Sequence, residues 1–212
     1  MCTGRVDLAF VLRAFSNGAD GVFIGGCWPG ECHYVTEGNY DVLKNVHIAK
    51  KLLEQIGVSP DRLRLEWISA SEGMRYAEVM NDFGRRLKEL GPLGKGEGIE
   101  AGTLQLKLEA VTKLVPYIKL VERERLRVRF STEEEYTNYF ASDELKKIFN
   151  ELLVDKLSVS EILLLLREKP QTSMEISEAL GLNPSDVSRH LKSSTRHGLV
   201  RYDQGLKSYA LA

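Results

Sequence analysis

Helical and extended patterns of apolar residues alternate through the first part of the chain. Apolar residues recur three or four positions apart after Asp7, after Gly38 and after Glu72, which predicts three helices. Between these segments lie an apolar run at 22–24 and an alternating apolar and charged run at 63–67, which predict two strands. Helices that alternate with strands are typical of a parallel sheet covered by helices. All strands of such a sheet deliver their C-terminal ends to one edge, where ligands bind.

Local signals predict where these elements begin and end. Asp7 is the expected N-cap of the first helix, and Asn17 with Gly18 is expected to end it. Ser69 and Glu72 have the spacing of a capping box, which predicts that the third helix begins there. We expect that helix to bury its apolar residues, which are Tyr76, Met80, Phe83, Leu87 and Leu90.

The middle of the chain begins with a segment, 91–98, in which four of eight residues are glycine and one is proline. This composition is typical of a linker, so we expect a domain boundary there. An amphipathic helix follows and is expected to end at Pro116. Residues 118–130 alternate charged and aliphatic side chains, which favours a solvated, salt-bridged segment. Residues 133–149 look helical, with core aromatics Tyr136, Tyr139, Phe140 and Phe149.

The last part of the chain resembles a winged helix-turn-helix domain. An apolar helix ends at Lys169-Pro170, and Thr172 caps a short helix that ends at Gly181. Asn183-Pro184 begins a further helix, and a hairpin follows around 203–205. This order of elements is that of winged helices. The expected exposed side of the recognition helix carries Ser185, Ser188, Arg189, Lys192 and Arg196.

The charge of this last part argues against a DNA-binding role. Residues 158–212 hold seven basic and six acidic side chains, a net charge of about +1. A DNA-binding module usually carries a clear basic stripe. Winged helices also serve in docking and dimerisation, and a fold does not fix a function. We therefore favour docking, including homodimer contact through this domain, over DNA contact.

Composition sets the class of protein. The 212 residues suit one large or two small domains, and the predicted parts are an α/β domain at 1–92, a linker and helical segment at 93–154, and the winged helix at 155–212. With 29 basic and 30 acidic residues, the chain as a whole is not a polyanion binder. No apolar run could span a membrane, and no secretory signal opens the chain. Three cysteines argue against a disulfide scaffold, so we expect a cytoplasmic location.

The three cysteines are the candidate site residues. Cys27 and Cys32 lie in a loop rich in glycine and proline directly after the predicted strand at 22–24. Their spacing is that which opens the ligand set of plant-type iron–sulfur proteins. The alternative is a pair of small buried hydrophobic residues at the end of a strand. Cys2 lies just before the first helix, where all three sulfurs could share one edge of the sheet, and this favours a metal or cluster site. His33 is expected to be a polar loop residue, and His47, His190 and His197 are expected to be solvated.

Five motifs, in order, resemble the delta subunit of methyl-viologen-reducing hydrogenase, also called the hydrogenase iron–sulfur subunit family. They lie at 2–7, 18–22, 26–34, 37–40 and 66–73, so the resemblance covers residues 1 to about 92. It implies a non-catalytic electron-transfer subunit that binds a 2Fe–2S cluster. The resemblance gives Cys2, Cys27 and Cys32 as cluster ligands. Family members with this C-terminal extension and winged helix are also known, so the resemblance extends along the chain.

The resemblance also implies partners. Family members pass electrons between a hydrogenase, a formate dehydrogenase or a similar input module and the flavin-containing A subunit of heterodisulfide reductase, in electron-bifurcating complexes of anaerobes. The alternative function is a redox- or metal-responsive transcription regulator that acts through the winged helix.

One departure from the family concerns the start of the chain. The family carries an upstream strand and a cysteine-rich motif that have no counterpart here, and a complete cluster usually needs four ligands where this chain has three cysteines. Two strands alone would also leave an open sheet edge and an uncovered apolar face. We therefore expect that this sequence begins in the middle of its fold, and that another polypeptide or a longer reading frame supplies the missing strand and ligand.

Overall fold

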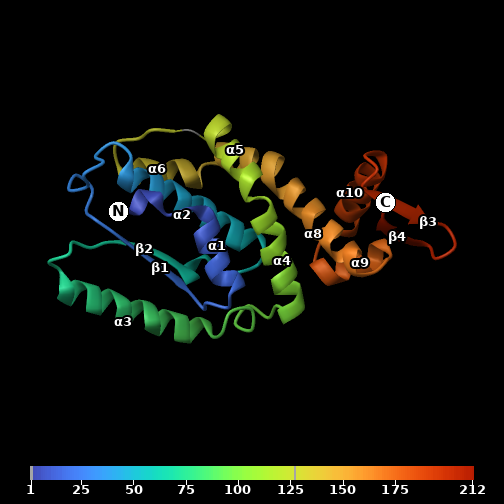
Figure 1. Ribbon diagram of the computed structural model, residues 1–212, viewed down its shortest axis with the longest axis horizontal. Helices are drawn as coiled ribbons and strands as arrows, with labels where there is room; N and C mark the ends of the chain where they lie inside the picture. Colours follow the sequence, from blue (N-terminus) through green and yellow to red (C-terminus); the bar gives the residue numbers. More distant parts are fainter. Residues whose placement is uncertain (1, 127) are drawn as a thin grey trace.

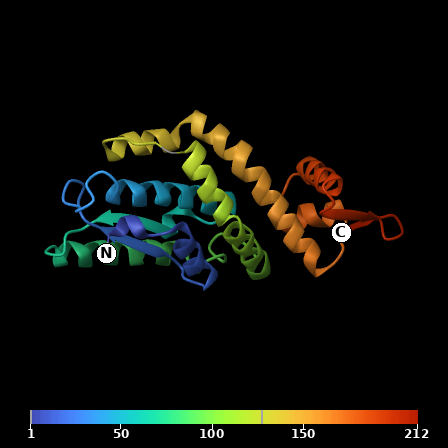
Figure 2. The ribbon, with the colours of Figure 1, turned by 45° about the horizontal axis from the view of Figure 1, so that its top comes forward.

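A two-stranded parallel sheet lies at the centre of the N-terminal part of the protein. The computed structural model describes residues 2–126 and 128–212. Strand β1 (Val22–Gly26) pairs in parallel with β2 (Leu63–Trp67). Figure 2 shows α2 (Gly38–Gln55) on one side of the sheet and α3 (Gly73–Leu90) on the other. Helix α1 (Leu8–Ser16) precedes β1 and packs against α2. The predicted alternation of helices and strands is confirmed.

The two faces of this sheet are packed unequally. The face beneath α1 and α2 holds the main core, whose fully buried members include Leu12, Phe15, Ile48, Leu52 and Leu63. On the other face α3 buries only Val79 and Phe83, and half of Tyr76 is exposed. The prediction that α3 buries five apolar residues is therefore wrong for all but Phe83. A sheet of two strands is too narrow to cover the apolar stripe of a long helix. The ring of Phe23 on β1 packs against Tyr76 and Phe83 of α3.

The edge of β1 away from β2 has no strand beside it among residues 2–126 and 128–212. Successive carbonyl groups of β1 point to opposite edges of the strand. The carbonyl oxygen of Gly26 accepts a hydrogen bond from Ile68 N, directly after β2, at 2.7 Å. The carbonyl oxygen of Gly25 accepts one from Thr3 Oγ1 at 3.1 Å. A cavity of about 410 Å³ runs along this edge, and the exposed ring of Phe10 lines it. The open edge of β1 agrees with the expectation that a sheet of only two strands leaves an edge uncovered.

Helix starts follow the predicted caps at α1 but not at α3. Asp7 caps α1 and accepts a hydrogen bond from Ala9 N at 2.8 Å, as predicted. The prediction that a capping box at Ser69 begins the third helix is wrong, because α3 begins only at Gly73. The carboxylate of Glu72 does accept a hydrogen bond from Ser69 N (2.6 Å), but it also accepts one from Trp28 and so belongs to the loop before the helix.

The glycine-rich segment 91–98 wraps around the side chain of Arg62, which ends the 3₁₀ turn η2 (Pro60–Arg62) and is fully buried. Its guanidinium donates to Glu97 Oε1 at 2.6 Å and to the carbonyl oxygens of Asp20 and Gly91, each at 2.9 Å. Burial alone would raise the pKa of Glu97, but the hydrogen bonds from Arg62 and Ser59 outweigh it and hold that pKa below its ordinary value. The buried guanidinium thus fixes the path of this segment.

Four helices follow and extend the main core. They are α4 (Ala101–Lys113), α5 (Val115–Arg125), α6 (Glu133–Ala141) and α7 (Asp143–Phe149). Pro116 lies in the first turn of α5 instead of ending a helix, since proline is favoured there. The prediction of a solvated segment at 118–130 is wrong over α5, which buries Ile118 and Val121. Met1 and Arg127, which fall within predicted segments, lie outside the described residues.

The aromatic residues predicted for the core at 133–149 pack there, but on two helices. Tyr136, Phe140 and Phe149 are buried, and Tyr139 is partly buried against the same core. Ser142 separates α6 from α7 and caps α7.

One long helical path joins the two parts of the molecule (Figure 1). Helix α7 runs through a π-helical turn, η3 (Asn150–Val154), into α8 (Asp155–Glu168). Leu157 and Leu164 of α8 belong to the main core, whereas Leu165 and Leu166 belong to the smaller core of the C-terminal unit. The same helix therefore serves both cores.

The C-terminal unit is a winged helix, as predicted. It continues from α8 with α9 (Ser173–Leu180), α10 (Pro184–Arg196) and the antiparallel strands β3 (Val200–Asp203) and β4 (Ser208–Leu211). Thr172 caps α9 in a capping box, and Asn183 caps α10. The five residues predicted for the outer side of α10 are all exposed.

Two histidines depart from the prediction of solvated side chains. His190 on α10 is 5% exposed, and the ring of His47 on α2 stacks on Phe140 with a centroid distance of 4.9 Å. His197 is exposed, as expected. Among the described residues, no helix combines the length and the apolar character needed to cross a bilayer.

Replacement of Arg62 by leucine should destabilise the fold by about 3–5 kcal/mol, because it leaves the carboxylate of Glu97 buried without its charged partner. Urea unfolding followed by circular dichroism measures the change. Arg85→Ala is the control, since its ion pair with Asp82 is exposed and such pairs contribute about 0–1 kcal/mol. Equal effects of the two substitutions would contradict a structural role for the buried pair.

Glu161 of α8 should make stability fall as the pH rises. It is 4% exposed, and burial raises its pKa to about 7 from an ordinary value of 4.5, against the opposing charge of Lys107. Between these two values the folded chain binds more protons than the unfolded chain, so unfolding becomes easier with rising pH. Glu161→Gln should therefore gain stability relative to the wild type across this window, by up to about 1.4 kcal/mol per pH unit. Urea unfolding of both proteins at several pH values tests this, and a difference that is independent of pH would refute it.

Candidate functional site

The C-terminal ends of β1 and β2 lead into two loops that are tied together. The indole Nε1 of Trp28, in the loop after β1, donates to the carboxylate of Glu72 in the loop after β2, at 2.7 Å. The guanidinium of Arg75 lies 5.1 Å from the centre of the Trp28 ring. A second tie joins the first loop to α2, since Asn39 Nδ2 donates to the carbonyl oxygen of Cys27 at 2.5 Å. These contacts fix the cysteine loop at the edge of the sheet where ligands are expected.

Two of the three predicted site residues lie together at this edge. The Sγ atoms of Cys2 and Cys32 are 3.6 Å apart, although 30 positions separate them in the sequence. Cys2 caps the 3₁₀ turn η1 (Thr3–Arg5), and its sulfur accepts a hydrogen bond from Gly4 N at 3.4 Å. Cys32 is buried, and both are free thiols. The pairing confirms that residues near Cys2 and the loop after β1 meet at one edge.

Both sulfurs lie against the first turn of α2. A Cβ atom on Gly38, the first residue of α2, would lie 2.6 Å from the sulfur of Cys32 and 2.7 Å from that of Cys2. A Cβ atom on Gly4 would in turn lie 2.6 Å from the carbonyl oxygen of Gly38. The two glycines therefore let η1, the cysteine loop and α2 approach closely. Sequence analysis did not identify Gly38 as a site residue, because nothing in its spacing shows what it contacts.

Cys27 directly follows β1 and is half-buried, and it is held through its backbone carbonyl. Within residues 2–126 and 128–212, no group of three or more histidine, cysteine, aspartate or glutamate side chains is arranged to hold a metal ion. The structure thus brings Cys2 and Cys32 together and does not place Cys27 in a common ligand group with them.

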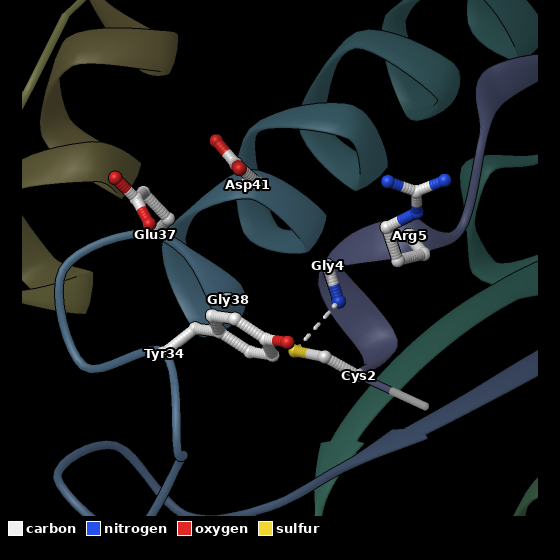
Figure 3. A pocket seen from close by; sticks show the side chains of 7 residues that line it. All are labelled: Cys2, Gly4, Arg5, Tyr34, Glu37, Gly38 and Asp41. Atoms are coloured by element: carbon white, nitrogen blue, oxygen red, sulfur yellow. Dashed lines mark hydrogen bonds between the residues drawn. The ribbon is translucent and has the colours of Figure 1, made fainter.

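An open cavity of about 480 Å³ adjoins the sulfur of Cys2 (Figure 3). Its lining includes the charged residues Arg5, Glu37 and Asp41 and the exposed ring of Tyr34. Burial is the main factor that raises the pKa of the Cys2 thiol, and the neighbouring Cys32 adds to it, while the hydrogen bond from Gly4 opposes the shift. His33 is exposed in the same loop and packs edge-on against Tyr34, as expected of a polar loop residue.

Residues from the middle of the chain bind α2 and the end of β2 near this site. The hydroxyl of Tyr40 on α2 donates to the carbonyl oxygen of Ser131 at 2.7 Å. The indole of Trp67, at the end of β2, donates to Glu133 at the start of α6, at 2.8 Å. These partners lie 91 and 66 positions apart in the sequence, so no local pattern could have indicated them.

The donor chemistry of this site fits an iron–sulfur group in part. Thiolate sulfurs are the ligands that hold such clusters. Two sulfurs converge here, and the one of Cys2 also borders the open cavity of about 480 Å³. The described residues do not converge as a complete set of four ligands.

Two family models match the chain, one at each end. The model described as methyl-viologen-reducing hydrogenase, delta subunit, matches residues 1–91. The model described as bacterial regulatory protein, arsR family, matches residues 158–202, within the winged helix.

Curated relatives match the same N-terminal region. The chain is 52% identical over 91 residues to the iron-sulfur D subunit of the F420-non-reducing hydrogenase of Archaeoglobus profundus, which is 43% of this chain and 66% of that protein. It is 40% identical over 92 residues to the vhu iron-sulfur D subunit of the F420-non-reducing hydrogenase of Methanopyrus kandleri, 43% of this chain and 69% of that protein.

A third relative carries this region inside a much longer polypeptide. The A subunit of the ferredoxin/F420H2-dependent CoB-CoM heterodisulfide reductase of Methanosarcina acetivorans is 48% identical over 94 residues, which is 44% of this chain and 12% of that protein. The chain therefore spans about two thirds of the hydrogenase relatives and a small part of the heterodisulfide reductase relative. Through residues 1–91, this protein belongs to the family of the methyl-viologen-reducing hydrogenase delta subunit.

Proposed function

We propose that this protein is an electron-transfer subunit that holds a 2Fe–2S cluster and relays electrons to or from the flavin subunit of a heterodisulfide reductase-type bifurcating complex. Its electron-input partner is a hydrogenase, a formate dehydrogenase or a similar module. The observation that carries the proposal is the 3.6 Å approach of the Cys2 and Cys32 sulfurs inside the region that is 52% identical to an iron–sulfur subunit.

The chain's own residues hold and shield the group. Cys2 and Cys32 are the proposed first ligands, and Cys27, half-buried directly after β1, is the proposed third. A bound cluster supplies one-electron transfer, whose potential the protein tunes through hydrogen bonds, burial and charge. The first turn of α2 lies against both sulfurs and has no side-chain cap, and the positive end of the helix dipole favours negative charge there. Trp28 lies in the same loop as Cys27 and Cys32 and is held by Glu72.

The proposed flavin-subunit partner rests on the relatives. One of them carries this region as part of the A subunit of a heterodisulfide reductase, and others carry it in a separate hydrogenase subunit. A region found both fused to and separate from a larger protein favours direct contact between the two in the assembled complex.

A second candidate function is a redox- or metal-responsive transcription regulator, and the match of residues 158–202 to the arsR family favours it. The outer face of α10 argues against it. Arg189 donates two hydrogen bonds to Asp155, at 3.0 and 3.1 Å, and a third to Asp186 at 3.2 Å. A guanidinium that is occupied by two carboxylates is a poor phosphate ligand. We therefore place docking before DNA contact as the role of the winged helix.

Co-expression with a heterodisulfide reductase A-type subunit should give a stable complex that contains iron and labile sulfide. In that complex, serine in place of Cys2, Cys27 or Cys32 should lower the affinity for the cluster, because an alcohol binds iron far more weakly than a thiolate. The expected loss is at least about tenfold, which is the loss seen when residues that only support a metal ligand are replaced. Iron analysis and visible absorbance measure the loss.

His33→Ala is the matched control for this experiment, since His33 lies in the same loop, carries a metal-binding side chain and is exposed. Its iron content should equal that of the wild type. Unchanged iron in all three serine variants, or a free dimer that ignores the A-type subunit, would overturn the proposed function.

The winged helix should bind duplex DNA only non-specifically, with a dissociation constant no tighter than about 10⁻⁶ M at physiological salt. Fluorescence anisotropy with random and promoter duplexes at several salt concentrations tests this. Lys192→Ala with Arg196→Ala removes two exposed cations of α10 and should leave complex formation unchanged. Lys146→Ala with Lys147→Ala, on α7, is the matched control. Tight, sequence-specific binding that only the α10 variant loses would instead support the regulator.

A further inference from the structure

The contact between Gly38 and the two sulfurs is closer than any side chain would allow. Ordinary van der Waals contact of a Cβ atom begins at 3.4 Å, whereas a Cβ atom on Gly38 would meet the sulfurs at 2.6 and 2.7 Å. Both sulfurs would have to move by most of an ångström to admit a methyl group. Gly38 does not have a positive φ angle, so its backbone conformation suits any residue. The contacts alone therefore require glycine at this position.

The surroundings leave the sulfur of Cys32 little room to move, and a hydrogen bond restrains the sulfur of Cys2 beside its open cavity. The side chain of Cys32 is 4% exposed, and the sulfur of Cys2 is held by Gly4 N. Helix α2 is also fixed, since Gly38 N donates to the carbonyl oxygen of Tyr34 at 2.9 Å and Asn39 binds the loop after β1. A close-packed interior transmits such a displacement instead of absorbing it.

We propose that Gly38 is a positioning residue: its missing side chain lets the sulfurs of Cys2 and Cys32 converge against the first turn of α2. A side chain at this position separates the two sulfurs and removes them from the N-terminus of the helix. The role of Gly38 in holding iron rests on the function proposed above, whereas its role in the convergence of the sulfurs stands on the geometry alone.

Formation of a disulfide between Cys2 and Cys32 tests this convergence without any metal. The full chain carries Cys27→Ser, so that Cys2 and Cys32 are its only thiols. Diamide is the oxidant: two S–H bonds break, one S–S bond forms, and the two protons and two electrons reduce the N=N bond of diamide to a hydrazine. Mass spectrometry follows the loss of two hydrogens with time.

Gly38→Ala should slow this reaction about 10- to 100-fold, since a misplacement of about 1 Å has effects of that size on reactions between positioned groups. Gly73→Ala is the matched control, because Gly73 is the first residue of α3, follows a glutamate as Gly38 does, and has no atom within 4 Å of an added Cβ. A rate for Gly38→Ala equal to those of the parent and of Gly73→Ala would overturn the proposal.

A thermodynamic cycle covers the case in which Gly38→Ala lowers the melting temperature. The substitution is repeated in a chain with Cys2→Ala and Cys32→Ala, where no sulfur meets the new methyl group. We expect the loss of stability to disappear there, because the coupling lies between Gly38 and the sulfurs. An equal loss with and without the sulfurs would show that the methyl group meets something else.

Iron analysis of the complex with the A-type subunit separates this proposal from the proposed function. The iron analysis uses chains that keep Cys27. If the Cys27→Ser chain forms the disulfide rapidly but the complex of the wild-type chain holds no iron, the function fails and the positioning role stands. If the wild-type complex holds iron and Gly38→Ala changes neither that iron content nor the disulfide rate of the Cys27→Ser chain, the positioning role fails and the function stands.

Discussion

Close packing at the first turn of α2 is the constraint on which the site depends. Gly38 leaves its backbone bare against both sulfurs, and Gly4 leaves η1 bare against Gly38. Asn39 holds the loop after β1, and the hydroxyl of Tyr40 holds the carbonyl oxygen of Ser131 ahead of α6. One helical turn thus contacts three segments, which are η1, the loop after β1 and the segment ahead of α6. Because the contacts of Gly38 and Gly4 involve backbone and short side chains, a single methyl group added at either position disturbs them.

The second constraint is the helical path through α7 and α8, which joins the two cores. Leu164 of α8 packs into the main core and Leu165 into the smaller one, so neither core is complete without this helix. The ion pair from Arg189 to Asp155 ties α10 to the start of α8. The winged helix is therefore carried on the same element that packs against the α/β part.

The elements that the sequence predicted well depend on interactions within a few residues. Asp7, Thr172 and Asn183 cap helices because each side chain accepts a hydrogen bond from a backbone N–H two or three positions later. The strands at β1 and β2 and the hairpin of the wing follow from short apolar runs bounded by turn residues. The sequence likewise supplied the thiol chemistry of the site and the motifs that relate residues 1–91 to a family.

Tertiary structure alone decided which of these residues meet and which remain exposed. Tyr76 has the spacing of a core residue and yet is half exposed, because the sheet beneath α3 is only two strands wide. Glu72 binds Ser69 N and also Trp28, 44 positions away, in the loop before α3, and the helix begins only at Gly73. The approach of Cys2 to Cys32 and the need for glycine at position 38 likewise depend on atoms brought together by folding. A sequence pattern records the local preference of a residue, whereas its contact partners are fixed only when distant segments pack.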